Sequence, residues 1–336
     1  MTSSKIAILD VGHGNCAVVI DRGGTSIIDA GLGGTLLDFL HENKVNQVEY
    51  VLISHADTDH IGGLIGLLAA DDISVREVYL NPDPVRTSKI WEDLKSVLKE
   101  ARSKRGTVVK NGLSTTIPGE MNTGDILIRV MAPAPELALS GIGGTLATGA
   151  RVSAHTLNAV ILVLYEGTGI ALFPGDLDET GLDELRAEQR DMRAKVLVFP
   201  HHGGLPGKDP SAFARLLCEL VKPETVVFSI GRGRHQTPRP EVVSAIRSAS
   251  PGTHIACTQL SDRCAATLPT PIPSHLSSEV ALGREKNQCC AGTLVIHPLP
   301  SRPTRVDHAA FITIAAPTAV CKEEVGDSSR GRSAKR

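Results

Sequence analysis

The segment from Ser54 to Gly63 concentrates residue types that bind metal ions. Two histidines, at positions 55 and 60, and two aspartates, at 57 and 59, directly follow the apolar run 51–53. A strand that ends in a turn can direct His55 and Asp57 to one side and Asp59 and His60 to the other. Imidazole and carboxylate groups are ligands of first-row metals, so the pattern predicts two adjacent divalent ions. The alternative is a solvated acidic loop, and the recurrence of histidine and aspartate downstream argues against it.

Further candidate ligands lie at the ends of strand-like runs, where open α/β sheets usually place their chemistry. Taken singly, an aspartate after a glycine is more often a turn residue, and a histidine pair is more often structural. Their joint occurrence with the 54–63 segment predicts a single site. The candidates are Asp29, His155, Asp176, His201 and His202.

The elements that must position these residues follow from hydrophobic periodicity and turn signals. Strands come first in each half of the chain and then alternate with helices, which favours two sheets packed face to face with helices outside. Residues 102–122 and 133–151 are expected to be irregular. Expected strands are 5–10, 16–20, 26–29, 48–53, 75–80, 126–131, 157–165, 169–173, 195–199, 225–230 and 254–257; expected helices are 36–42, 61–70, 88–101, 179–190, 211–221 and 240–248.

Composition limits the function classes. The formal net charge of −2 gives no global field that would attract nucleic acid, so any polyanion must bind a local patch. The first residues show no signal peptide, and the longest apolar run, 159–164, is too short to cross a bilayer. We therefore expect a cytoplasmic protein without a membrane partner.

Five motifs, in order, resemble the metallo-β-lactamase fold. The run 55–60 resembles the HxHxDH signature, with Asp57 in place of the middle histidine. The remaining matches are 28–31 with the first Asp motif, 154–156 with the segment that carries the third histidine, 173–176 with the bridging Asp motif, and His201 or His202 with the last histidine. The resemblance covers about residues 5–257 and implies an αββα sandwich with a dinuclear site at its edge.

A narrower resemblance is to the hydrolase domain of ComEC-type DNA-uptake proteins and their soluble relatives. Residues 10–15 are similar to its DVGQGD opening, residues 198–204 are similar to its KVPHHGS segment, and Asn158 also fits. Asn15 and Gly204 depart from an acidic residue and a serine of that pattern. In place of its GHP triplet, Thr237 precedes Pro238, and His235 lies two residues earlier.

The resemblance implies roles for the candidate residues. His55, Asp57 and His155 would hold one metal ion, and Asp59, His60 and one of His201 and His202 would hold the other. Asp176 would bridge the two ions, and Asp29 would orient a ligand by hydrogen bonding. Asp59 and Asp29 are thus the carboxylates expected to be essential for catalysis. A carboxylate at position 57 leaves room for manganese beside zinc.

The function expected from these roles is hydrolysis of a phosphodiester by a metal-bridging hydroxide. The substrate would be DNA, RNA or a nucleotide, bound by residues that include Asn158 and the loop residues Arg232, Arg234, His235 and Arg239. A solvated loop is an equal alternative for these arginines. Competing functions are hydrolysis of a small ester, lactone or thioester, and a non-enzymatic metal-binding module.

The end of the chain differs in composition. Residues 1–257 are expected to form the hydrolase domain, residues 258–321 a Pro-rich, Cys-containing extension packed on the core, and residues 322–336 a disordered tail. Short strands are expected at 293–297 and 311–314. Cys257, Cys264, Cys321 and either Cys289 or Cys290 could form a structural zinc site, with Cys289 in the preferred set; buried reduced thiols are the favoured alternative.

Overall fold

Two seven-stranded sheets face each other in the computed structural model, which describes residues 4–270, 273–298, 305–316, 319 and 321–322. The first sheet has the order β14-β1-β2-β3-β4-β5-β6 and the second β13-β12-β11-β10-β9-β8-β7. The first consists of β1 (Lys5–Ile8), β2 (Cys16–Asp21), β3 (Gly24–Ala30), β4 (Gln47–Ile53), β5 (Ser74–Leu80), β6 (Val108–Asn111) and β14 (Leu294–Ile296). The second consists of β7 (Glu120–Asn122), β8 (Ile126–Ala132), β9 (Val160–Tyr165), β10 (Thr168–Phe173), β11 (Val196–Val198), β12 (Thr225–Phe228) and β13 (His254–Cys257).

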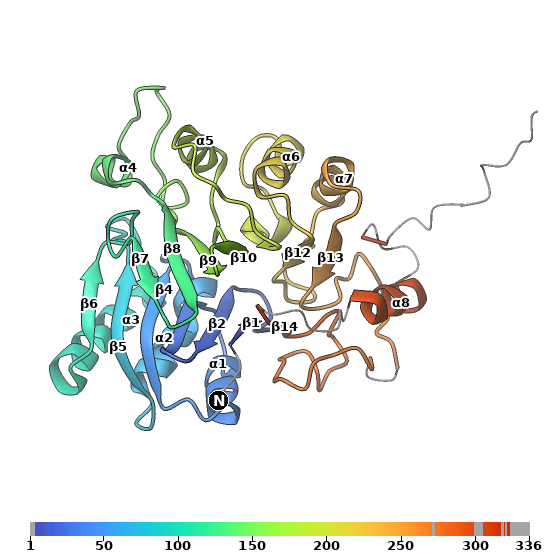
Figure 1. Cartoon of the computed structure of the whole chain (residues 1–336), viewed down its shortest axis with the longest axis horizontal. Coiled ribbons are helices and arrows are strands. Elements are labelled where there is room, and N and C mark those ends of the chain that lie inside the picture. Colours follow the sequence, from blue (N-terminus) through green and yellow to red (C-terminus); the bar gives the residue numbers. More distant parts are fainter. Residues whose placement is uncertain (1–3, 271–272, 299–304, 317–318, 320, 323–336) are drawn as a thin grey trace, which may run out of the picture.

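Helices cover the outer face of each sheet, which confirms the predicted αββα sandwich (Figure 1). The first sheet is covered by α1 (Thr35–Glu42), α2 (Thr58–Ala69) and α3 (Lys89–Glu100). The second is covered by α5 (Glu179–Ala187), α6 (Pro210–Val221) and α7 (Pro240–Ala249). The remaining helices are α4 (Pro135–Ser140), which lies in the expected loop 133–151, and α8 (Arg305–Ala315).

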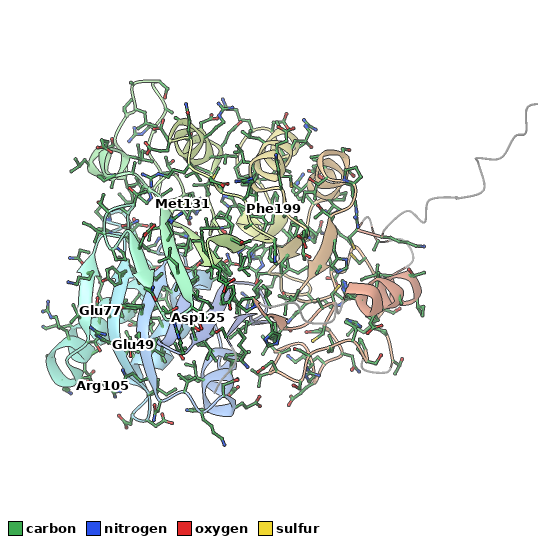
Figure 2. All side chains as sticks on the ribbon, viewed as in Figure 1. Glu49, Glu77, Arg105, Asp125, Met131 and Phe199 are labelled. Carbon is green, nitrogen blue, oxygen red and sulfur yellow. The ribbon has the colours of Figure 1, made fainter. Side chains whose placement is uncertain are left out.

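Side chains that alternate along the strands build three apolar layers. In β4, Leu52 joins the layer between the sheets, whereas Val51 and Ile53 join the layer under α1–α3. Because both faces of such a strand are covered, its sequence is a continuous apolar run. Met131 and Phe199, labelled in Figure 2, belong to the layer under α5–α7.

The direction of the strands brings the candidate ligands to one edge. Strands β3, β4, β5 and β6 run parallel, as do β10, β11, β12 and β13. Most of the candidates therefore lie at the carboxyl ends of parallel strands in both sheets, where α/β folds place their chemistry, whereas His155 precedes the antiparallel strand β9. Asp29 and His55 belong to the first sheet, and Asp176 and His201 to the second.

The C-terminal part contributes to the sandwich. The expected strand at 293–297 is confirmed as β14, which pairs antiparallel with β1 through Ile296 and Ile6. The expected strand at 311–314 is wrong, because these residues belong to α8. Phe311–Ile314 has the composition of a strand, but Ile312 is buried while Ile314 is 83% exposed, so one helical face packs inward.

Two expectations, on the domain division and on the C-terminal tail, stay predictions. The division into residues 1–257 and 258–321 remains a prediction. Of the expected disordered tail 322–336, all residues but Lys322 lie outside the described part of the chain.

Across the described residues, no helix combines the length and the apolar character needed to cross a bilayer.

Candidate metal centre

The turn after β4 carries the first group of candidate ligands. Helix α2 begins at Thr58, earlier than the expected 61, so Asp59 and His60 lie in its first turn and Asp57 precedes it. The loop 10–15 reaches this turn, where the Asn15 amide donates to the Asp59 carbonyl oxygen at 3.1 Å. Gly14 permits the approach, since a Cβ there would lie 2.4 Å from that oxygen, and its φ of +144° suits glycine.

One set of ligand atoms comes from His55, Asp57 and His155, whose atoms all lie within 4.8 Å of one another. Asp57 Oδ2 is 3.3 Å from His155 Nε2 and 3.7 Å from His55 Nε2. The other oxygen, Oδ1, accepts a hydrogen bond from Arg86, which fixes the orientation of the carboxylate. The structure thus brings together the three residues predicted for the first ion.

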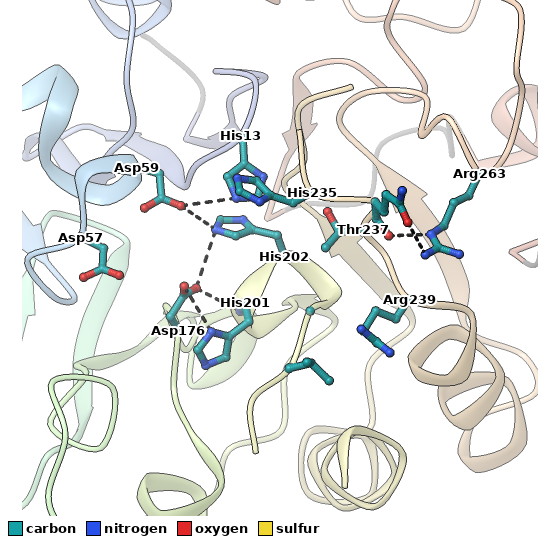
Figure 3. A pocket seen from close by; sticks show the side chains of 13 residues that line it. His13, Asp57, Asp59, Asp176, His201, His202, His235, Thr237, Arg239 and Arg263 are labelled. Carbon is teal, nitrogen blue, oxygen red and sulfur yellow. Dashed lines mark hydrogen bonds and ion pairs between the residues drawn. The ribbon is translucent and has the colours of Figure 1, made fainter. Parts of the chain in front are cut away.

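A second set comes from His13, Asp59 and His202, again within 4.8 Å of one another (Figure 3). Asp59 Oδ2 is 3.1 Å from His202 Nε2 and 3.7 Å from His13 Nε2. His202 Nδ1 donates to the Ser229 carbonyl oxygen at 2.7 Å, which leaves Nε2 facing Asp59. His13 was missing from the predicted ligands, although it stands where the DVGQGD pattern has a glutamine.

Asp176 lies between the two sets. Its Oδ2 is 4.0 Å from His55 Nε2, and its Oδ1 is 3.5 Å from His60 Nε2 and 3.9 Å from His202 Nε2. The two carboxylate oxygens therefore face different histidines. His60 also joins a third group of ligand atoms, with His55 and Asp176.

Asp29 holds the ring of His60 from the opposite side. Its Oδ2 lies 2.8 Å from His60 Nδ1, and its Oδ1 accepts a hydrogen bond from the Ser54 amide at 2.7 Å. With Nδ1 engaged, His60 Nε2 points toward Asp176. This contact is the one that the orienting role of Asp29 requires.

The adjacent histidines His201 and His202 occupy different places. His202 belongs to the second set, whereas His201 Nδ1 is 3.4 Å from Asp176 Oδ2. The His201 amide also donates to Asp176 Oδ1 at 3.0 Å. Both residues have positive φ angles, 49° and 54°, a conformation that costs non-glycine residues energy and that clusters at functional sites.

The buried polar atoms of the centre test whether a cation fits. His55 Nε2, His60 Nε2, His201 Nε2 and His13 Nδ1 are buried without a hydrogen-bond partner. A buried nitrogen without a partner costs free energy, and a divalent cation would satisfy those that face the carboxylates. The donor set therefore fits divalent metal ions.

Burial and the neighbouring charges set the protonation of these groups. Burial lowers the pKa of His13 to about 3 and that of His201 to about 4. Burial raises the pKa of Asp59, but the hydrogen bond with His202 and nearby imidazoles outweigh it and lower the pKa. For His60, burial lowers the pKa, and the charges of Asp29 and Asp176 raise it well above its usual value. A cation bound at His60 would have to displace that proton.

A cavity of about 440 Å³ opens over the second set (Figure 3). His235 and Arg239, two of the expected substrate contacts, line it together with Arg263. Arg263 was missed by sequence reasoning. It lies in the 258–321 extension, and its guanidinium donates to the carbonyl oxygen and to Oε1 of Gln236 at 2.7 and 2.8 Å.

The three other expected substrate contacts, Asn158, Arg232 and Arg234, are not among the residues that line this cavity. Asn158 is fully buried, and its side chain binds the Asp176 amide and the Pro174 carbonyl oxygen, so it shapes the Asp176 turn. Arg232 is anchored by Asp262 and by backbone oxygens such as that of Leu260, because its guanidinium turns into the extension. Arg234 is exposed and does not line the cavity.

The structure also corrects the preferred set of cysteines. Cys289 Sγ donates to Asp10 Oδ2 at 3.6 Å, whereas Cys290 Sγ lies 3.2 Å from His308 Nε2. The three close groups of metal-type ligands found among the described residues contain no cysteine. The structural zinc site with Cys289 is therefore unsupported.

Comparison with known proteins identifies the family. The chain is 24% identical over 279 residues to ComE operon protein 3 of Bacillus subtilis strain 168, an alignment that covers 74% of this chain and 31% of that protein. The chain thus spans about a third of the length of this relative. Similar solved structures include Igni18, a metallo hydrolase of Ignicoccus hospitalis (18% identity, 75% of this chain and 94% of that one, TM-score 0.44). Another is the metallo-beta-lactamase fold protein YhfI of Bacillus subtilis (9% identity, 75% and 96%, TM-score 0.46).

A family model also matches the chain. The model described as the Metallo-beta-lactamase superfamily matches residues 9–229, a span that includes both sets of ligand atoms and Asp176. The chain therefore belongs to the Metallo-beta-lactamase superfamily.

Proposed function

We propose that this chain hydrolyses phosphodiesters with two divalent metal ions. The observation that carries the proposal is the position of Asp176, whose Oδ2 faces His55 of the first ligand set and whose Oδ1 faces His202 of the second. A carboxylate in that position suits a bridge between two cations, and two adjacent cations suit an in-line displacement at phosphorus.

The residues assigned to each ion follow from the distances. His55, Asp57 and His155 would hold the first ion, and His13, Asp59 and His202 would hold the second. The family resemblance also assigns His60 to the second ion, and its Nε2 faces Asp176 Oδ1, as that of His202 does. When bound, the ions would neutralise charge on the phosphoryl oxygens and lower the pKa of water. The mixture of imidazole and carboxylate ligands suits zinc or manganese.

The protein's own contribution is to hold ligands and substrate in place. Asp29 and the Ser229 carbonyl oxygen fix the rings of His60 and His202, so each ring presents Nε2 to the centre. Arg86 fixes Asp57 in the same way. This support sets the positions of the ligands before a substrate arrives.

The cavity wall supports a phosphate-containing substrate. Arg239 and Arg263 line the cavity that also contains Asp59 and His202. A guanidinium matches the geometry of phosphate oxygens and carries a permanent charge. None of the residues that line the cavity is Phe, Tyr or Trp, so the backbone of a nucleic acid or nucleotide, rather than stacked bases, would be bound there.

The test compares substrates and arginine variants. The purified protein, supplied with manganese, magnesium or zinc, is assayed against bis-p-nitrophenyl phosphate, a lactone, RNA, and single- and double-stranded DNA. We expect Arg239→Gln and Arg263→Gln each to weaken binding of DNA or RNA and to reduce its salt dependence by about one counterion.

Arg234→Gln is the matched control, because Arg234 is exposed on the same loop and does not line the cavity. It should leave salt dependence unchanged, and all three variants should hydrolyse a neutral ester as the parent does. Preferential cleavage of the lactone, with phosphodiesters untouched by any metal, would make the chain a small-ester hydrolase instead.

A further inference from the structure

The segment that follows β13 binds two loops that approach the metal ligands. We call the two ligand sets and the carboxylate between them the His/Asp centre. Gln259 lies two residues after the end of β13 and is 3% exposed. Its Oε1 accepts a hydrogen bond from the Arg232 amide at 2.8 Å, and its Nε2 donates to Asp10 Oδ1 at 2.9 Å. One buried side chain therefore joins the 10–15 loop to the 230–236 loop.

Asp10, the first residue of the 10–15 loop, is fully buried. Besides the bond from Gln259, its Oδ1 accepts one from the Gly12 amide at 3.1 Å, and its Oδ2 accepts one from the Gly283 amide at 2.9 Å. The Leu282 amide donates to the Asp10 carbonyl oxygen at 2.9 Å. A buried carboxylate that loses a donor remains desolvated without compensation. The start of this loop is thus held largely by the segment that follows β13.

The two joined loops meet at His13, which belongs to the second ligand set. A Cβ at Gly231 would lie 2.5 Å from the His13 amide nitrogen, so a side chain there would separate the loops. The His13 ring centroid lies 4.2 Å from that of His202 and 4.2 Å from that of His235 (Figure 3). The position of the His13 ring therefore depends on both loops.

The chemistry of a glutamine suits this junction. Its amide carries a donor and an acceptor in one rigid group, and each has a partner on a different loop. A glutamate at position 259 would place a second carboxylate against Asp10, and a lysine could not accept from the Arg232 amide. An apolar side chain would leave both partners buried without that bond.

We propose that Gln259 is a positioning residue of the His/Asp centre. By holding the 10–15 loop against the 230–236 loop, it keeps His13 Nε2 beside Asp59, where the second ion would bind. This inference rests on the two-ion site of the proposed function. It adds the segment after β13 to the catalytic unit, although the span matched by the family model ends at residue 229.

Gln259→Met tests the role, because methionine has a similar length and volume but forms neither hydrogen bond. Metal-free full-length protein is titrated with manganese in a calorimeter. We expect the affinity at the second ligand set to fall by about 10-fold, as for other residues that orient a ligand, with the first set unchanged. The second set is recognised as the one that His13→Gln weakens.

A double variant separates positioning from a general loss of packing. If Gln259 acts through His13, manganese binding by the variant with both His13→Gln and Gln259→Met should be no weaker than by His13→Gln alone. A merely structural role would weaken both ligand sets or would add to the effect of His13→Gln. Gln259→Asn keeps the amide but is too short to reach both partners, so it provides a milder change with the same expected direction.

Thr253→Val is the matched control. Thr253 is buried before the other end of β13, and its hydroxyl donates to the Pro223 carbonyl oxygen at 2.7 Å. Loss of a buried hydrogen bond should lower the melting temperature of Thr253→Val and of Gln259→Met alike. Only Gln259→Met should weaken manganese binding at the second set.

The inference is overturned if Gln259→Met and Gln259→Asn bind manganese at both sets as the parent does. It is also overturned if the effects of His13→Gln and Gln259→Met add. A parent protein that takes up no metal would refute the two-ion proposal itself, and this inference with it. The two failures are therefore distinguishable.

Discussion

The His/Asp centre and the contacts among Cys290, His308 and His254 differ in what their donor atoms do within the folded chain. In the His/Asp centre, nitrogens such as His55 Nε2 and His60 Nε2 are buried without a partner. In the second region, Cys290 Sγ lies 3.2 Å from His308 Nε2, and His308 Nδ1 lies 3.0 Å from His254 Nε2. Ring nitrogens of the His/Asp centre therefore lack partners, whereas both ring nitrogens of His308 have one.

This difference teaches how each region should respond to metal. The ligands of the His/Asp centre are fixed by supports such as Asp29 and Arg86, so adding or removing an ion should change the fold little. Cys290, His308 and His254 contact one another directly, so removal of metal ions should leave this second region unchanged. The predictions below concern the His/Asp side of this contrast.

The largest effect is expected for Asp59→Ala. The change removes the carboxylate of the second ligand set, and losing the charge stabilisation of one ion, ~4 kcal/mol, corresponds to about a 1000-fold loss of phosphodiester hydrolysis. Circular dichroism and melting of the metal-free protein should stay close to the parent. Asp183→Ala, at an exposed position on α5, serves as the control that keeps activity. Full hydrolysis by folded Asp59→Ala would refute the role of that set.

A smaller effect is expected for His13→Gln, which restores the glutamine of the DVGQGD pattern. If His13 Nε2 binds the second ion, metal affinity at that set should fall by at least about 10-fold while the first set is unaffected. Calorimetric titration of metal-free protein with manganese measures both sites. His41→Gln, on α1 beside Asp72, is the control for replacing a histidine. An unchanged second affinity would show that His13 only packs against His202.

The smallest effect concerns pH. Burial lowers the pKa of His13 to about 3 and of His201 to about 4, from the ordinary 6.5. Below pH 6.5 the unfolded chain binds protons at these two histidines, whereas the folded chain does not. Metal-free protein should therefore lose stability as the pH falls from about 6.5 to about 4.

The pKa values of His60 and His155 are raised instead. The stability that these two residues contribute is present at low pH and is lost as the pH rises through their folded pKa values. Melting temperatures measured in the presence of a chelator across this pH range give the slope of stability against pH. His13→Gln should make the slope shallower by about one proton, and an identical slope would contradict the assignment to His13.

The sandwich was predictable because its strands are covered on both faces and its helices carry strong apolar stripes. Strand β13 coincides with the predicted 254–257, and α1, α3 and α6 agree to within a residue or two. Predictions failed where local composition and packing disagree. Residues 311–314 have strand composition, yet their register on α8 buries Ile312 and exposes Ile314.

In the site, ligand types near strand ends could be read from the chain, whereas contacts between distant loops could not. His13 joins the second set, and Arg263 lines the cavity over it, only because the 10–15 loop and the 258–292 segment fold next to each other there. The choice between His201 and His202 depends on ring orientation, which the Ser229 carbonyl oxygen fixes. Arg232 could not be distinguished from Arg239 without knowing that Asp262 and the Leu260 carbonyl oxygen hold it.

The pairing of β14 with β1 has a consequence for how the protein is made. The first sheet begins with residue 5, but its outer strand arrives only with residues 294–296. While the ribosome is still adding the residues between them, β1 exposes an unpaired edge of buried apolar character. Such an edge can pair with another nascent chain, so slow translation of the last fifth of the message should favour aggregation of this protein over its folding.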